Sequence, residues 1–214
     1  MLLALDVGNT QTVVGLYDGG TLAEHWRTTS VRTHTADELA VELAGLLAIR
    51  GRSFADVSAT VASSGVPRLA DSLSAVARSH FGHEALVVVD FGTAINFDAV
   101  SSAGEFVGGA IAPGLEVSVN ALGERAARLF GIELATPPAA IGKNTAENMQ
   151  SGAIFGFAGL VDGMVRRFAS ELGRLSVIAT GGLAGLVTPH CETVDEVEPW
   201  LTLDGLRLIW ERNR

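Results

Sequence analysis

Two stretches of the same pattern decide the fold: residues 2–10, Leu-Leu-Ala-Leu-Asp-Val-Gly-Asn-Thr, and residues 86–94, Leu-Val-Val-Val-Asp-Phe-Gly-Thr-Ala. Each is an apolar run typical of a buried strand, and each ends in an Asp-x-Gly turn. A further turn signal follows each aspartate at the same spacing, at residues 18–20 and 102–104. Two chance turns are the alternative, but the matched spacing favours two equivalent β-hairpins and therefore a duplicated fold.

Helical and strand patterns alternate along the rest of the chain. Residues 35–38, Thr-Ala-Asp-Glu, form a capping box that predicts a helix with apolar residues 39, 43, 46 and 47 on one face. Further elements are expected as a strand at 57–62, a helix at 69–77, a long helix from Thr145, its expected cap, to about Leu172, and a strand at 175–179. This alternation predicts an α/β fold with mixed sheets flanked by helices.

Composition and charge narrow the class of protein. The 214 residues are 48% hydrophobic and 18% charged, which is enough to form a core without disulfides. Cys191 is the single cysteine, the N-terminus lacks signal-peptide features, and no long apolar run is present, so a cytoplasmic protein without a membrane partner is expected. The net charge of −9 speaks against a nucleic-acid partner.

The candidate binding and catalytic residues lie at the ends of the predicted strands. Asp6 can hold a cation, Gly8 allows close approach to a phosphate, and Asn9 and Thr10 supply donors. Taken alone, this turn is explained equally well as an ordinary hairpin. Together with the second Asp-x-Gly turn and a third turn at residues 180–182, it predicts a nucleotide site, with phosphates at the hairpins and adenosine at the glycine pair.

Four glycines of the predicted long helix share one face: Gly152, Gly156, Gly159 and Gly163. Each lowers helix propensity by about 1 kcal/mol relative to alanine. This cost is most simply offset by close backbone packing, so we expect helix packing or a subunit contact at this face rather than a ligand site.

Six motifs, in order, resemble those of the type III pantothenate kinases, which belong to the acetate kinase, sugar kinase, Hsc70 and actin superfamily. They are residues 6–10, 90–94, 108–114 (Gly-Gly-Ala-Ile-Ala-Pro-Gly), 142–145 (Gly-Lys-Asn-Thr), 179–182 (Ala-Thr-Gly-Gly) and 201–206 (Leu-Thr-Leu-Asp-Gly-Leu). The resemblance implies two ribonuclease-H-like lobes, expected at residues 1–84, which look shortened, and 85–214.

The resemblance also implies a reaction, the ATP-dependent phosphorylation of pantothenate to 4′-phosphopantothenate, which begins coenzyme A biosynthesis. It implies Mg²⁺, a monovalent cation (K⁺ or NH₄⁺) and a homodimer. By position, the ATP-binding residues would be Asp6, Val7, Gly8, Asn9, Thr10, Gln11, Thr12, Val13, Thr93, Gly181 and Gly182. Asp6 would also hold Mg²⁺ and position the phosphates, Asp90 would bind the monovalent cation, and Thr145 would contact pantothenate.

One departure from the family concerns the catalytic base. The family carries a Gly-Ala-Asp-Arg motif, with its base and a pantothenate-binding arginine, between the two lobe-opening hairpins, and this chain lacks it. Either the segment is truly absent, as in a degenerate or engineered member, or the sequence omits residues of the natural protein. The alternatives to an active kinase are a catalytically dead nucleotide-binding or regulatory homologue, and another small-molecule kinase that uses Asp6 or Asp98 as its base.

Overall fold

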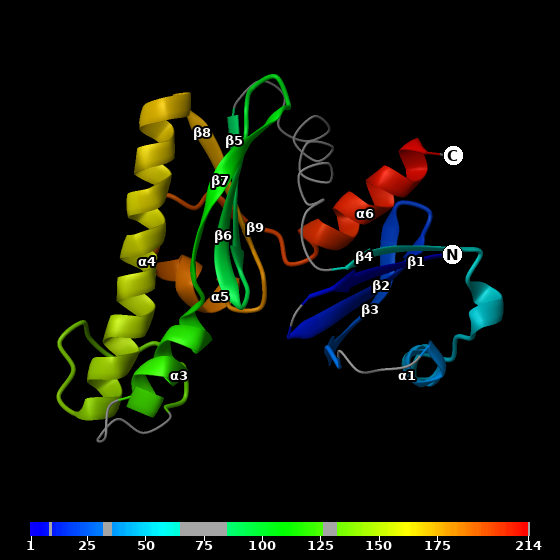
Figure 1. Cartoon of the computed structure of the whole chain (residues 1–214), viewed down its shortest axis with the longest axis horizontal. Helices are drawn as coiled ribbons and strands as arrows, with labels where there is room; N and C mark the ends of the chain where they lie inside the picture. The colour runs from blue at the N-terminus through cyan, green and yellow to red at the C-terminus, as the bar shows by residue number, and fades with distance from the viewer. Residues whose placement is uncertain (9, 32–35, 65–84, 126–131, 214) are drawn as a thin grey trace. The chain divides into compact units, whose positions relative to one another are not determined.

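The computed structural model describes residues 1–8, 10–31, 36–64, 85–125 and 132–213 (Figure 1). The chain divides into two compact units, Met1–Val76 with Trp200–Arg214, and Ala77–Pro199. Each unit contains one mixed sheet flanked by helices, so the predicted α/β class is confirmed. The expected lobe boundary after residue 84 stays a prediction. The grouping of the C-terminal segment with the first unit was not anticipated from the sequence.

The first unit has four strands in the order β3-β2-β1-β4. Its elements are β1 (Leu2–Val7), β2 (Gln11–Asp18), β3 (Thr21–Thr29), α1 (Ala36–Ile49), a 3₁₀ turn (Phe54–Asp56), β4 (Ala59–Ser64) and α6 (Leu201–Arg212). Strands β1, β2 and β3 are antiparallel neighbours, and β4 joins β1 in parallel. Because β1 lies inside the sheet, its first four residues are buried on both faces.

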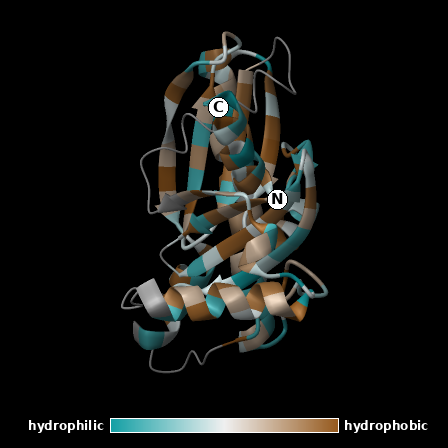
Figure 2. Cartoon of the chain, turned by 90° about the vertical axis from the view of Figure 1, so that its right-hand side faces the viewer, coloured by the Kyte–Doolittle hydropathy of each residue, from teal (hydrophilic) through white to brown (hydrophobic). Residues whose placement is uncertain are grey.

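The two faces of the first sheet carry separate clusters of buried residues. Leu2 and Ala4 pack with Leu203 and Leu206 of α6, while Leu3 and Leu5 pack with Leu47 of α1. Helix α6, which runs to the C-terminal label, alternates hydrophobic and hydrophilic residues as a helix with one buried face requires (Figure 2). The phenol of Tyr17 anchors this helix by donating to Oδ1 of Asp204 at 2.9 Å.

The second unit repeats this arrangement with one strand more, in the order β7-β6-β5-β8-β9. Its elements are β5 (Ala85–Phe91), β6 (Ala94–Val100), β7 (Phe106–Pro113), α3 (Leu115–Arg125), α4 (Thr145–Leu172), β8 (Leu175–Thr180), α5 (Ala184–Val187), a 3₁₀ turn (Thr188–His190) and β9 (Glu196–Val197). Helix α4 runs along one face of the sheet (Figure 1) and buries Ile154 and Val161 against Val87, Val89 and Phe97.

A buried carboxylate fixes the segment between α5 and β9. Asp162 of α4 is 5% exposed, and its Oδ1 accepts hydrogen bonds from the backbone of Glu192 and from the backbone and hydroxyl of Thr193. Buried carboxylates need such donors, because an unpaired charge is costly in the interior. The bonds hold this segment against α4 as it approaches β9.

The two sheets share the details of their opening hairpins as well as their strand order. In both, the strand that ends in Asp-x-Gly is central, with its hairpin on one side and a parallel strand on the other. In both, the register shifts by one residue at a bulge, after Leu16 in β2 and after Ala99 in β6. The predicted duplication is therefore visible in the strand pairing.

The structure also corrects details of the predicted elements. Asn144, not Thr145, caps α4, because its side chain accepts from the backbone N–H of Glu147 at 3.0 Å. The predicted strand at 57–62 lies at Ala59–Ser64, and Leu39, expected on the buried face of α1, is 38% exposed. The predicted cap of α1 at Thr35 and the predicted helix at 69–77 lie outside the described residues. Within the described part, none of the helices is long and apolar enough to cross a membrane.

Candidate functional site

The first Asp-x-Gly turn connects β1 to β2 and is tightly closed. The backbone N–H of Gly8 donates to the carbonyl oxygen of Gln11 at 3.0 Å. A Cβ added to Gly8 would lie 2.8 Å from that same oxygen, which is closer than side chains tolerate. Glycine is therefore required by this turn whether or not a phosphate approaches it.

Asp6 lies on one face of the first sheet, and the charged residue Arg27 lies on the same face, two strands away. It pairs with Val13 on β2, and Val13 pairs with Arg27 on β3, so the three side chains form a row across the sheet. Burial raises the pKa of Asp6, while the positive charge of Arg27 acts to lower it. Arg27, which the sequence analysis did not single out, is thus part of the electrostatic environment of Asp6.

The residues predicted to bind ATP in this hairpin do not all share the face of Asp6. The side chain of Val7 packs with the cluster on the α1 side of the sheet. Thr12, the register partner of Val7, is 7% exposed, and its hydroxyl is hydrogen-bonded to that of Ser30 at 2.8 Å. Their side chains belong to the sheet's structure, while Asn9 lies outside the described residues.

The second Asp-x-Gly turn, between β5 and β6, is closed by the glycine that precedes α3. The N–H of Gly92 donates to the carbonyl oxygen of Ala94 at 3.0 Å, and the N–H of Gly114 donates to that of Thr93 at 3.1 Å. A Cβ on Gly114 would lie 2.2 Å from the Thr93 oxygen, so only glycine allows this approach. Gly114, the last residue of the motif at 108–114, therefore packs directly against the turn that contains Thr93.

The turn after β8 packs directly against Asp90. Strand β8 runs parallel to β5, with Thr180 opposite Asp90, so both strands end at the same edge of the sheet. Gly181 has a φ of +94°, and a Cβ there would lie 2.5 Å from Oδ1 of Asp90. Within the second unit, the structure therefore brings together Asp90 and Gly181, which the sequence predicts to bind a cation and ATP.

Thr145 is exposed in the first turn of α4, at the end of the Gly-Lys-Asn-Thr motif. The neighbouring residues fix the start of the helix, because Glu147 accepts hydrogen bonds from the backbone N–H of Lys143 at 2.7 Å and from the side chain of Asn144 at 2.8 Å. With Asn144 capping the helix, the Thr145 hydroxyl is not needed for that purpose.

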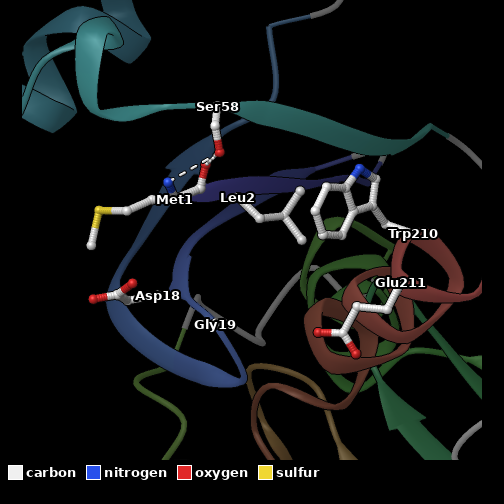
Figure 3. A pocket seen from close by; sticks show the side chains of 7 residues that line it. All are labelled: Met1, Leu2, Asp18, Gly19, Ser58, Trp210 and Glu211. Atoms are coloured by element: carbon white, nitrogen blue, oxygen red, sulfur yellow. Dashed lines mark hydrogen bonds between the residues drawn. The ribbon is translucent and has the colours of Figure 1, made fainter. Parts of the chain in front are cut away.

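A hollow of about 420 Å³ lies elsewhere on the first unit, at the start of β1 (Figure 3). It is lined by Met1, Leu2, Asp18, Gly19, Ser58, Trp210 and Glu211. The N-terminal ammonium group is already bonded there, to the Ser58 hydroxyl at 3.3 Å and the carbonyl oxygen of Asp56 at 3.0 Å. Since β1 ends at the Asp6 turn and begins at this hollow, none of the predicted site residues lines it.

Comparison with known proteins identifies the family. A model of the type III pantothenate kinases matches residues 2–86 and 73–167. The type III pantothenate kinase of Streptomyces avermitilis is 46% identical over 100% of this chain and 98% of its own length, and that of Thermobifida fusca is 44% identical over the full length of both. The chain belongs to the type III pantothenate kinase family.

This type III pantothenate kinase lacks a segment that its relatives have. The alignment with the Streptomyces avermitilis protein spans 261 positions and this chain has 214 residues, so at least 47 positions have no counterpart here. The family model matches in two pieces that both include residues 73–86. Two overlapping pieces are expected where a stretch of the model is missing, which agrees with the absent Gly-Ala-Asp-Arg motif. The junction lies outside the described residues.

Solved structures support the fold of this type III pantothenate kinase. An archaeal actin homologue superposes with a TM-score of 0.64 over 100% of both chains, at 12% identity. The (R)-2-hydroxyglutaryl-CoA dehydratase component A of Acidaminococcus fermentans gives a TM-score of 0.61 over 97% of this chain and 96% of its own, at 16% identity. At these identities the likeness concerns the fold alone, and it confirms the predicted actin-like architecture.

Proposed function

We propose that this chain transfers the γ-phosphoryl group of ATP to pantothenate, giving 4′-phosphopantothenate, the first step of coenzyme A biosynthesis. The observation that carries the proposal is the similarity over the whole chain to pantothenate kinases, at 46% identity with the Streptomyces avermitilis protein. The closed turns at Gly8 and Gly92 add physical support, since each is a tight turn two residues after a carboxylate, Asp6 or Asp90, that could hold a cation beside the phosphates. Coenzyme A synthesis and a single cysteine favour a cytoplasmic location.

The residues present suit a Mg²⁺ ion that is bound together with ATP. In phosphoryl-transfer sites, Mg²⁺ is usually held by one or two carboxylates and by phosphate oxygens. Asp6 offers such a carboxylate beside the Gly8 turn, and within the described part no group of three or more His, Cys, Asp or Glu residues could hold a metal. When bound, Mg²⁺ neutralises charge on the phosphates, and the turn orients them.

The second unit would supply the monovalent cation site and part of the pantothenate site. Asp90 is half-buried against Gly181, so its carboxylate is fixed in place for a K⁺ or NH₄⁺ ion. Thr145 would contact pantothenate across the subunit boundary of a homodimer. The open face formed by Gly152, Gly156, Gly159 and Gly163 supports such a dimer, because among the described residues no atom outside the adjoining turns of α4 lies within 4 Å of a Cβ added at any of them.

A second function is favoured by the missing segment. Without the family's catalytic aspartate and pantothenate-binding arginine, the chain would bind ATP and turn over slowly, as a catalytically dead or regulatory homologue. A positioned base typically contributes about 10² to 10⁴ in rate. ATP binding survives in this case, because both closed turns and Gly181 are present.

One pair of measurements separates the two functions. A coupled assay with ATP, Mg²⁺, K⁺ and pantothenate measures turnover, and fluorescence titration measures ATP binding by the same preparation. Binding with turnover near that of a full-length relative supports the kinase. Binding with turnover lower by about 10² or more supports the inactive homologue, and inserting the segment of a relative should then restore activity. Failure to bind ATP would contradict both.

A further inference from the structure

Arg27 is a basic side chain of the first unit to which neither the sequence analysis nor the proposed function gives a role. It lies in the row Asp6–Val13–Arg27, with one strand between the carboxylate and the guanidinium. The ordinary spacing of strands places the two outer backbones about 10 Å apart. At this separation a phosphate group above Val13 would be within reach of both a cation on Asp6 and the guanidinium of Arg27.

The guanidinium of Arg27 is held by a neutral partner. Its Nη1 donates to Oε1 of Gln11 at 3.1 Å, and among the described residues no carboxylate lies within ion-pair distance of it. Two other arginines of this unit are neutralised: Arg50 pairs with Glu24 at 3.3 Å, and Arg207 pairs with Glu211 at 2.9 Å. A phosphate could replace the amide of Gln11 at the cost of one hydrogen bond to a neutral acceptor, and the bond to an anion would be stronger.

The residue that holds Arg27 also closes the turn. The carbonyl oxygen of Gln11 accepts the hydrogen bond from Gly8, while its side chain accepts from Arg27. The guanidinium is therefore tied to the turn that faces the ATP phosphates in the proposed function. In the duplicated hairpin the equivalent row is Asp90–Asn96–Ile111, and Ile111 is 76% exposed, so the basic group belongs to the first hairpin alone.

We propose that Arg27 is a phosphate-binding residue of the ATP site, which leaves Gln11 and donates to phosphate oxygens when ATP binds. The inference rests on the proposed function, because it takes the first turn to be the phosphate site. Arginine suits this role since its planar group presents two parallel donors to a phosphate. The guanidinium would also offset the repulsion between the phosphates and the carboxylate of Asp6.

The test compares nucleotides that differ in their phosphates. MgATP, MgADP and adenosine are titrated into the wild-type chain and into the Arg27→Gln and Arg27→Lys variants. Loss of a charged hydrogen bond should weaken binding of MgATP to Arg27→Gln by about tenfold to a hundredfold, and adenosine binding should not change. Arg27→Lys keeps the charge without the two-donor geometry, so it should fall between the other two. Arg50→Gln removes an arginine paired elsewhere and should bind all three ligands as the wild type does.

The outcomes separate the inference from the function on which it rests. If the wild type binds MgATP and Arg27→Gln binds it equally well, the inference is wrong and the proposed function stands. Equal losses for adenosine and MgATP, or a lowered melting temperature, would mean that Arg27 acts on the structure and not on phosphate. If the wild type binds neither MgATP nor MgADP, both the proposed function and the inference are wrong.

Discussion

Oδ1 of Asp90 lies only 2.5 Å from the point that a Cβ on Gly181 would occupy. The backbone N and C of Phe91 are each 2.7 Å from that same point, so a rotation of the aspartate side chain would not make room. With its φ of +94°, Gly181 is also in a conformation that other residues rarely adopt. The predicted cation residue and the turn after β8 are thus held together by close backbone packing.

Replacing Gly181 with alanine should therefore destabilise the second unit. We expect Gly181→Ala to lower the free energy of unfolding by about 1–3 kcal/mol, through strain at positive φ and the clash with Phe91. Urea unfolding measures the change. Gly45 in α1 is the matched control, because a Cβ there meets no atom within 4 Å from described residues outside its own helix turns, and Gly45→Ala should raise stability by about 0.5–1 kcal/mol. Equal stabilities of Gly181→Ala and wild type would contradict the packing argument.

Replacing Asp6 with asparagine should abolish most turnover. The change removes the negative charge proposed to hold Mg²⁺ and to balance the phosphates, so we expect kcat to fall by about 10² or more. The assay is run on the natural chain if it is active, and otherwise after a relative's segment has been inserted. Activity within a few-fold of the parent chain would show that Asp6 does not position the metal.

Asp90→Asn should instead reduce the stimulation of turnover by the monovalent cation. The carboxylate is replaced by a neutral group of similar shape, so we expect the stimulation by K⁺ to shrink severalfold while turnover without K⁺ changes little. Turnover is measured across a K⁺ series with Na⁺ keeping the ionic strength constant. An unchanged K⁺ response would place the cation elsewhere.

Asp98 should make stability depend on pH in a predictable direction. Burial raises its pKa above the usual 3.8, and in the described structure its Oδ2 is buried without a hydrogen-bond partner. A carboxylate whose pKa is raised by folding costs stability when ionised, and the cost vanishes once the pH falls below the unfolded pKa. Asp98→Asn should thus be more stable than wild type at pH 7, and the difference should shrink as the pH falls.

Asp56 gives the control of opposite sign. Its Oδ2 accepts from the backbone N–H of Ser53 at 2.9 Å, and this bond lowers its pKa below 3.8. A lowered pKa adds stability that is present above the unfolded value and lost as the pH falls through the folded one. Asp56→Asn should therefore be less stable than wild type at pH 7.

Asp98→Asn also tests the hypothesis that Asp98 is the catalytic base, because this variant would then lose turnover.

Gly156→Leu should weaken the proposed dimer. Leucine on the open glycine face would overfill a close contact between two copies of α4, so we expect the dissociation constant to rise by about tenfold or more. Analytical ultracentrifugation at micromolar concentration measures it. A wild-type chain that sediments only as a 22.3 kDa species would show that no such dimer forms.

Much of the fold followed from local sequence patterns. The apolar run before Asp6 predicted β1, and the helix predicted from a cap at Thr145 to about Leu172 matches α4 except at its cap. The cap of α4 was wrong because Asn144 and Thr145 are both good capping residues, and only the backbone conformation selects between them. The packing of α6 on β1 was missed, since no local sequence pattern indicates which sheet a distant C-terminal helix will cover.

The sequence by itself determined the family, the duplication and the turns at Gly8 and Gly92, because these depend on residue types at fixed local spacing. The position of Arg27 depended on tertiary structure. Tyr17 pairs with Leu22 but Leu16 pairs with Glu24, so Ala23 has no partner and the register beyond it shifts by one residue. Without this bulge Val13 would face Trp26, since a one-residue slip moves every side chain to the other face. The bulge thus places a guanidinium, and not an indole, on the face of Asp6.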